Sequence, residues 1–219
     1  MLDKYGADPM RFYLMSSPLV QAEDLNFSES EIAGISRGMF RMLWNSYSFF
    51  VLYANIDNWK HDENYTGSQN ILDKWILSEL NTLTKNFNSE MEKYNLMKAS
   101  RLFPKFIDNL SNWYIRRSRK RFWKSESDLD KKCAYETLYY VLVELSKLMA
   151  PFTPFISEEI YKNLTGLESV HLADFPEHKK NNIDKELNAL MAQARDIVEL
   201  GLAERSKLGI KVRQPLQSI

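Results

Sequence analysis

The sequence predicts an all-α protein, an antiparallel helix bundle with a short extended segment at its C-terminal end. Amphipathic segments that begin at capping residues follow one another along the chain, and the short connections between them imply antiparallel neighbours. The 219 residues include only 7 glycines and 7 prolines, which argues against a loop-rich all-β fold. Hydrophobic residues make up 44% of the chain and aromatic residues 13%, enough for a substantial core.

Capping sequences mark the first predicted helices. Asp8-Pro9 places an acid that can cap a helix before a proline at the first helical position. Residues 17–27 are expected to form a connector. The capping box of residues 28–31 (SESE) then opens a helix that is expected to run to about Asn58. Two apolar stripes on this helix predict that neighbouring helices cover it on two sides.

The middle of the chain predicts two further long helices. A polar stretch at residues 59–69 reads as a surface loop, and the helix behind it is expected from Ile71 to about Tyr94. A short turn then leads into a helix that carries apolar residues from Ala99 onward. Pro104 lies inside this helix and is expected to kink it.

Two more helices are expected before Gly166. Residues 127–130 (SDLD) are another capping signature, and the helix that they open is ended by the prolines of residues 150–155. Thr153 can cap the following helix and Pro154 can open it, while Gly166 is expected to end it.

The pattern of apolar and polar residues changes after Gly166. Residues 169–176 look extended, and a final helix is expected from Asp184 to Leu208. Residues 210–216 alternate apolar and polar side chains, which predicts a half-buried strand. The predicted parts are a connector at 1–27, a helical bundle at 28–166, and an extended segment, linker, helix and junction at 167–219.

Composition excludes several classes of site. The formal net charge is zero, so a nucleic-acid site would have to be a local patch. The single cysteine, Cys133, excludes an internal disulfide and a cysteine-clustered zinc site. The histidines (His61, His171 and His178) are isolated and are expected at the surface.

We find no phosphate loop, catalytic set or metal site in the sequence. We also find no signal peptide and no apolar run of membrane length, so we expect a cytoplasmic protein without a membrane partner.

Residues 112–124 concentrate charge and aromatic rings. They contain six basic residues, four aromatic residues and no acidic residue. On an uninterrupted helical wheel the basic side chains of Arg117 and Arg121 continue the apolar face, whereas Arg116, Arg119 and Trp123 lie on the neighbouring face. Arginine binds phosphates and aromatic rings stack on bases, so the stretch suggests a nucleic-acid contact. A solvated helix end whose cations suit the helix dipole is the alternative, and the residues alone do not decide between them.

Six segments resemble isoleucyl-tRNA synthetases and occur in the order found in that family. They are residues 2–8 (LDKYGAD), 44–50 (WNSYSFF), 108–117 (DNLSNWYIRR), 150–155 (APFTPF), 169–172 (SVHL) and 209–216 (GIKVRQPL). The resemblance is to the helical anticodon-binding domain that follows the catalytic domain of class I synthetases. The two catalytic signatures of the family are missing, so the chain is expected to be an inactive fragment of a longer ligase.

The resemblance implies that the full enzyme attaches isoleucine to its tRNA with ATP and Mg²⁺, and that the fragment needs no cofactor. Its implied partner is the anticodon stem-loop of isoleucine tRNA, and the protein is expected to be monomeric. Related class I synthetases contact the anticodon through an asparagine and a tryptophan that match Asn45 and Trp123. The basic stretch and the resemblance together predict eight tRNA-binding residues: Asn45, Asn112, Arg116, Arg117, Arg119, Arg121, Phe122 and Trp123.

Two alternative functions stay open at this point. The same module could belong to a valine or leucine tRNA ligase, although valine relatives tend to carry an acidic residue near the position of Arg116. A helical protein-interaction module with a basic helix end would explain the charge without RNA.

Overall fold

The computed structural model describes residues 1–124 and 127–216, and it confirms the all-α prediction, since no strand occurs within these ranges. The chain divides into two compact units, Met1–Ile183 and Asp184–Ile219. The predicted division at residues 27/28 and 166/167 stays a prediction. Within the described ranges, no helix has both the length and the apolar character needed to cross a membrane.

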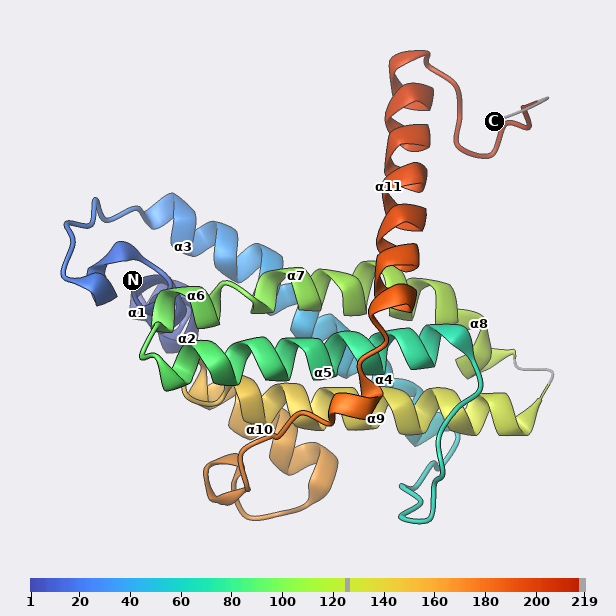
Figure 1. Ribbon diagram of the computed structural model, residues 1–219, viewed down its shortest axis with the longest axis horizontal. Coiled ribbons are helices and arrows are strands. Elements are labelled where there is room, and N and C mark those ends of the chain that lie inside the picture. The colour runs from blue at the N-terminus through green and yellow to red at the C-terminus, as the bar shows by residue number, and fades with distance from the viewer. Residues whose placement is uncertain (125–126, 217–219) are drawn as a thin grey trace. The chain divides into compact units, whose positions relative to one another are not determined.

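The first unit is a bundle in which long helices lie side by side (Figure 1). Its elements are α1 (Leu2–Tyr5), α2 (Ala7–Met15), the 3₁₀ turn η1 (Pro18–Gln21), α3 (Glu29–Ile35), the π-helix η2 (Ser36–Phe40), α4 (Arg41–Ile56), α5 (Ile71–Glu92), α6 (Leu96–Ser100), α7 (Phe103–Asp108), the π-helix η3 (Asn109–Ile115), α8 (Arg116–Trp123), α9 (Asp128–Met149), α10 (Pro154–Thr165), η4 (Val170–Leu172) and η5 (Lys180–Asn182). The second unit contains α11 (Lys185–Lys207).

Helix α9 contacts α4, α5, α8 and α10 within the first unit. It is buried along most of its length, and rings from other helices pack with it to form the core. The largest fully buried side chains include Trp75, Phe87, Phe103, Tyr114 and Phe152. Because each of these rings removes a large apolar area from water, this core is the main source of stability.

Two predicted helix starts, at Ser28 and Ser127, are capped as expected. Ser28 Oγ accepts a hydrogen bond from the Glu31 N–H at 3.3 Å, and Ser127 Oγ accepts one from the Asp130 N–H at 3.4 Å. Gly166 follows α10 in the left-handed conformation, with φ of 69°. These local signals are confirmed because a cap is satisfied by residues within one turn of it.

Asp8 does not cap the helix that contains it, which corrects the sequence prediction. It lies inside α2, and its carboxylate accepts hydrogen bonds from the backbone N–H groups of Ile156 (2.7 Å) and Phe155 (3.3 Å) at the start of α10. The expected cap, Thr153, instead donates its hydroxyl to the Met149 carbonyl. A residue 146 positions earlier therefore caps α10, which ties the chain's beginning to the bundle.

Three further expectations are corrected. The third long helix is interrupted at Arg101, and Pro104 lies in the first turn of the new helix α7 rather than at a kink. The segment at 169–176 contains the 3₁₀ turn η4. The strand expected at 210–216 is wrong, because those residues form turns and irregular backbone with Val212 exposed. Alternation predicts a strand only where a partner strand exists.

Candidate nucleic-acid interface

The π-helix η3 changes which residues of the basic stretch face the core. A π-helix bonds residue i to i+5, so its turn holds one residue more than an α-turn. The uninterrupted wheel placed Arg117 and Arg121 on the buried face, but the structure buries Ser118 and Phe122, one position later. The π-turn adds this one residue, so the prediction is wrong for Arg117, which is exposed, whereas the Arg121 side chain still reaches the buried side and is only 11% exposed.

Phe122 is therefore a core residue, and its expected contact with tRNA is wrong. Its side chain is fully buried, and its ring packs edge-on against Phe49 at 5.0 Å and Tyr135 at 4.9 Å between centroids. Phe122 joins α8 to α4 and α9 and holds the basic helix against the bundle.

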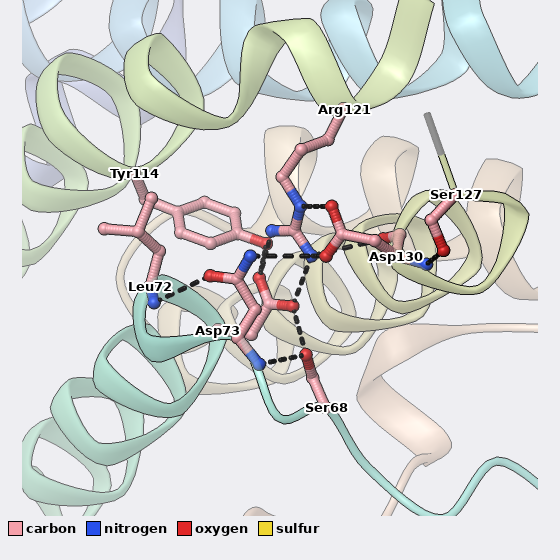
Figure 2. A network of polar contacts seen from close by, with 8 residues as sticks. Ser68, Leu72, Asp73, Tyr114, Arg121, Ser127 and Asp130 are labelled. Carbon is pink, nitrogen blue, oxygen red and sulfur yellow. Dashed lines mark hydrogen bonds and ion pairs between the residues drawn. The ribbon is translucent and has the colours of Figure 1, made fainter. Parts of the chain in front are cut away.

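Arg121 is held by two carboxylates and is not presented to a ligand, which corrects its expected contact with tRNA. Figure 2 shows its guanidinium between Asp73 of α5 and Asp130 of α9. Its terminal nitrogens lie 2.7 Å from both Asp73 oxygens, while Nε and Nη2 lie 2.8 Å from the Asp130 oxygens. Burial alone would lower the pKa of Arg121, but hydrogen bonds to Asp73 and Asp130 outweigh it and raise the pKa.

Asp73 is fully buried, and other polar groups complete its surroundings (Figure 2). The Tyr114 hydroxyl donates to it at 2.7 Å and the Ser68 hydroxyl at 2.6 Å. Burial, followed by the charge of Asp73, raises the pKa of Tyr114 well above its ordinary value of 10.0, so its phenol stays a donor. Two-point pairing with Arg121 and these donors compensate the buried carboxylate and fix the rotation of α8.

The other predicted basic residues are exposed. Arg116 and Arg119 project from α8, and Arg119 lies over the Phe49 ring at 5.8 Å. Arg117 is also exposed, but its guanidinium lies 3.6 Å from the centroid of the half-buried Trp113, a cation–π contact.

A surface cleft of about 390 Å³ brings together four of the eight predicted residues. They are Asn45 of α4, Asn112 of η3, and Arg116 and Arg119 of α8. The lining is completed by Ser46, Phe49, Ser111 and Ile115. Asn45 and Arg116 are 71 positions apart in sequence, so tertiary packing creates this site.

Sequence reasoning missed Phe49 and Ser111 as cleft residues. Phe49 lies one turn after Asn45 on the same helix, and that spacing of four could have identified it. Ser111 directly precedes Asn112, but its place in the cleft depends on the π-turn, for which the sequence carried no recognised signal.

Trp123 lies beyond the cleft at the end of an aromatic row. Its side chain is 51% exposed, and its ring leans on Tyr53 at 5.9 Å. Tyr53 in turn contacts Phe49 at 4.9 Å. The row therefore runs from the cleft to an exposed ring at the end of α8, where a base could stack.

The histidines differ from one another more than the sequence predicted. His61 is not isolated, because its Nδ1 lies 2.6 Å from Oε2 of the buried Glu136 on α9. The backbone N–H of Asp62 also donates to Glu136, at 2.9 Å. This pair anchors the loop after α4. No cluster of three or more candidate metal ligands occurs in the part of the chain that the structure describes.

The cleft combines three kinds of group. Carboxamides of Asn45 and Asn112 can bond to the edges of bases, arginines can bind phosphates, and the aromatic row offers ring faces. Proteins recognise unpaired RNA bases with this combination of stacking and edge hydrogen bonds. The geometry therefore suits a single-stranded nucleic-acid loop.

Comparisons with known proteins agree with this interpretation. A family model described as the anticodon-binding domain of tRNA ligase matches residues 73–219. The chain is 48% identical over 227 residues to the isoleucine–tRNA ligase of Dehalococcoides mccartyi (strain CBDB1), covering 100% of this chain and 22% of that protein. It is 44% identical over 219 residues to the isoleucine–tRNA ligase of Protochlamydia amoebophila (strain UWE25), covering 99% and 21%.

A solved structure shares the fold. It is the ternary complex LeuRS–tRNA–LeuAMS of Agrobacterium radiobacter K84 agnB2, with a TM-score of 0.59 and 17% identity, covering 84% of this chain and 21% of that one. The chain spans about a fifth of the length of the curated relatives it matches. The resemblance to isoleucyl-tRNA synthetases is confirmed, and because the family model covers more than half of the residues, the chain belongs to the family of anticodon-binding domains of tRNA ligases.

Proposed function

We propose that this chain binds the anticodon stem-loop of isoleucine tRNA as part of an isoleucine–tRNA ligase. The observation that carries the proposal is the cleft, which places Asn45 of α4 opposite Asn112, Arg116 and Arg119 of the η3–α8 helix. Relatives named isoleucine–tRNA ligase favour this function over a valine or leucine ligase. The family match argues against a protein-interaction module.

We further propose that the ligase uses ATP and Mg²⁺ to activate isoleucine outside this chain, so that the chain alone is inactive. The cleft offers amides, arginines and rings, which suit RNA and supply no carboxylate ligand for Mg²⁺. We also propose that the protein acts as a monomer. The tRNA partner supports a cytoplasmic location.

The test is filter binding of this chain to isoleucine tRNA over a series of salt concentrations. Arg116→Ala and Arg119→Ala should each weaken binding and reduce the slope of log affinity against log salt by about one, because each removes a phosphate contact. Lys85→Ala is the matched control, since Lys85 is an exposed cation on α5 outside the cleft.

Three outcomes would contradict these proposals. If both arginine variants keep the slope of the wild-type chain, the cleft does not contact phosphates. If tRNAs for valine or leucine bind as tightly as isoleucine tRNA, the specificity that we assign is wrong. Isoleucine-dependent pyrophosphate exchange by this chain alone would contradict its proposed inactivity.

A further inference from the structure

The two ends of the Asn112 carboxamide lie in different surroundings. Its Nδ2 donates to Oδ1 of Asp108 at 2.6 Å and to Sδ of Met42 at 3.4 Å. An ionised carboxylate only accepts hydrogen bonds, so the NH₂ end of the amide must face Asp108. If the amide were reversed, its oxygen would face the carboxylate oxygen and both would repel. The orientation therefore follows from the chemistry of the neighbouring side chain.

This arrangement leaves the carbonyl oxygen of Asn112 available to a ligand. Asn112 is exposed and lines the cleft, and its Oδ1 has no hydrogen-bond partner among residues 1–124 and 127–216. Asn45, on the opposite helix, has no such hydrogen bond within the described parts of the chain and can turn either end of its amide toward a ligand. The two amides of the cleft therefore differ, because Asn112 is held as an acceptor.

We propose that Asn112 accepts a hydrogen bond from the N–H-bearing edge of an unpaired base, and that Asp108 is the positioning residue that keeps the Asn112 oxygen available. The inference rests on the proposed function of the cleft. Amino groups of adenine, cytosine and guanine and ring N–H groups of guanine and uracil satisfy this acceptor. A base edge that offers a carbonyl or bare ring nitrogen meets a second acceptor and is rejected.

Asp108 acts on the base through Asn112, and its role is separate from phosphate binding. Its carboxylate carries negative charge, so it would not attract the RNA backbone. Arg116 and Arg119 supply that attraction, and they do so for any sequence. Discrimination between base edges with and without a donor and overall affinity should therefore respond to different substitutions.

The test uses RNA hairpins that carry the anticodon G-A-U, which pairs with an isoleucine codon. Each base is replaced in turn by an analogue that lacks a donor: inosine or N1-methylguanosine for guanosine, purine riboside for adenosine and N3-methyluridine for uridine. At one position we expect the wild-type chain to bind the analogue about five- to tenfold more weakly than the parent hairpin, the effect of one lost hydrogen bond.

Variants of the chain assign that effect. Asn112→Ala should bind the parent and the analogue equally, within about twofold, because the acceptor is gone. Asp108→Asn should reduce the ratio of the Kd for the analogue to the Kd for the parent hairpin to about two- to threefold, because an amide at position 108 tolerates either orientation of the Asn112 amide. Both variants should keep the salt slope of the wild-type chain, whereas Arg116→Ala should lower affinity and keep the analogue ratio.

Failure of this inference and failure of the proposed function give different results. If the wild-type chain binds no hairpin, the proposed function fails and the inference fails with it. If the chain binds the hairpin but no analogue changes affinity by more than about twofold, the function stands and the inference is overturned. An unchanged ratio in Asn112→Ala would overturn the role of Asn112, and an unchanged ratio in Asp108→Asn would overturn that of Asp108.

Discussion

Phe122 and Trp123 are adjacent aromatic residues with opposite surroundings. The Phe122 ring is fully buried between α4 and α9, whereas the Trp123 side chain is 51% exposed and leans on Tyr53. A one-residue step along α8 turns the side chain from the core to the surface. At this scale the structure separates a residue that stabilises the fold from one that is available for stacking.

We expect Trp123→Ala to raise the Kd for isoleucine tRNA by about tenfold, because stacking of a base on an aromatic ring contributes roughly 1–3 kcal/mol. Trp123→Phe should keep much of the affinity. Filter binding measures both. A hairpin that lacks the anticodon arm should bind the wild-type chain and Trp123→Ala equally.

Phe122→Ala is the matched control. It should lower the free energy of unfolding by about 3–5 kcal/mol, as truncation of a buried ring does. Trp123→Ala should leave the thermal melt nearly unchanged. If Trp123→Ala melts early and its binding defect disappears on cooling, the ring is a structural plug and does not stack on RNA.

At the scale of elements, the rotation of α8 depends on the Arg121 network. The helix follows a π-turn, and Arg121 joins it to α5 through Asp73 and to α9 through Asp130 (Figure 2). Arg116 and Arg119 face outward because Ser118 and Phe122 face inward. The buried ion pair thus gives the exposed arginines a defined direction.

Arg121→Met should lower the free energy of unfolding by about 3–5 kcal/mol, because it leaves the buried Asp73 carboxylate without its cation. Arg119→Met is the control, since it makes the same change at an exposed position of the same helix and should alter stability by less than about 0.5 kcal/mol. Urea unfolding monitored by circular dichroism gives both values. Equal effects of the two substitutions would show that the network does not stabilise α8.

The surroundings of Asp8 predict how the stability of the chain depends on pH. Burial raises the pKa of Asp8 above its ordinary value of 3.8, although the N–H groups of Ile156 and Phe155 partly oppose this. The folded state therefore binds the Asp8 proton more tightly than the unfolded state. This contribution to stability is fully present below pH 3.8 and is lost as the pH rises through the folded pKa.

The stability of the wild-type chain relative to Asp8→Asn should accordingly be greatest below pH 3.8, decrease above it and become constant beyond the folded pKa. Urea unfolding of both proteins at a series of pH values tests this, and Asp3→Asn, at an exposed position of α1, serves as the control. A relative stability of the wild-type chain that increases with pH would contradict the raised pKa.

At the scale of the whole molecule, the two units differ in how their helices are stabilised. In the unit Met1–Ile183, α9 contributes a long series of buried residues to the core. In the unit Asp184–Ile219, α11 has 23 residues and none of them is buried. A helix with no buried residue gains little from a packed face, which supplies most helical stability in proteins.

We therefore expect the backbone amides of α11 to exchange with deuterium much faster than those of α9. Hydrogen exchange read by mass spectrometry on this chain provides the measurement. Peptides from α5, another long helix of the first unit, are the internal standard for slow exchange. Protection of α11 equal to that of α9 would show that packing stabilises it.

The sequence by itself determined the all-α class, most helix starts and the general location of the basic surface. Ser28, Asn70, Ser127 and Asp184 each cap the helix that follows, because a cap is closed by backbone groups two or three residues away. The basic stretch was visible because charge and aromatic content are local properties of the sequence.

Only the tertiary structure decided which of those residues reach the cleft. The π-turn at η3 shifts the buried face of the helix by one position, so the Phe122 side chain lies in the core. Arg121 is bound by carboxylates from two other helices, α5 and α9. Asp8 likewise caps a helix that begins 146 residues after it. An uninterrupted helical wheel assumes 100° per residue throughout, so it represents neither an added residue in one turn nor a contact with a residue distant in sequence. Both of these features depend on packing between helices.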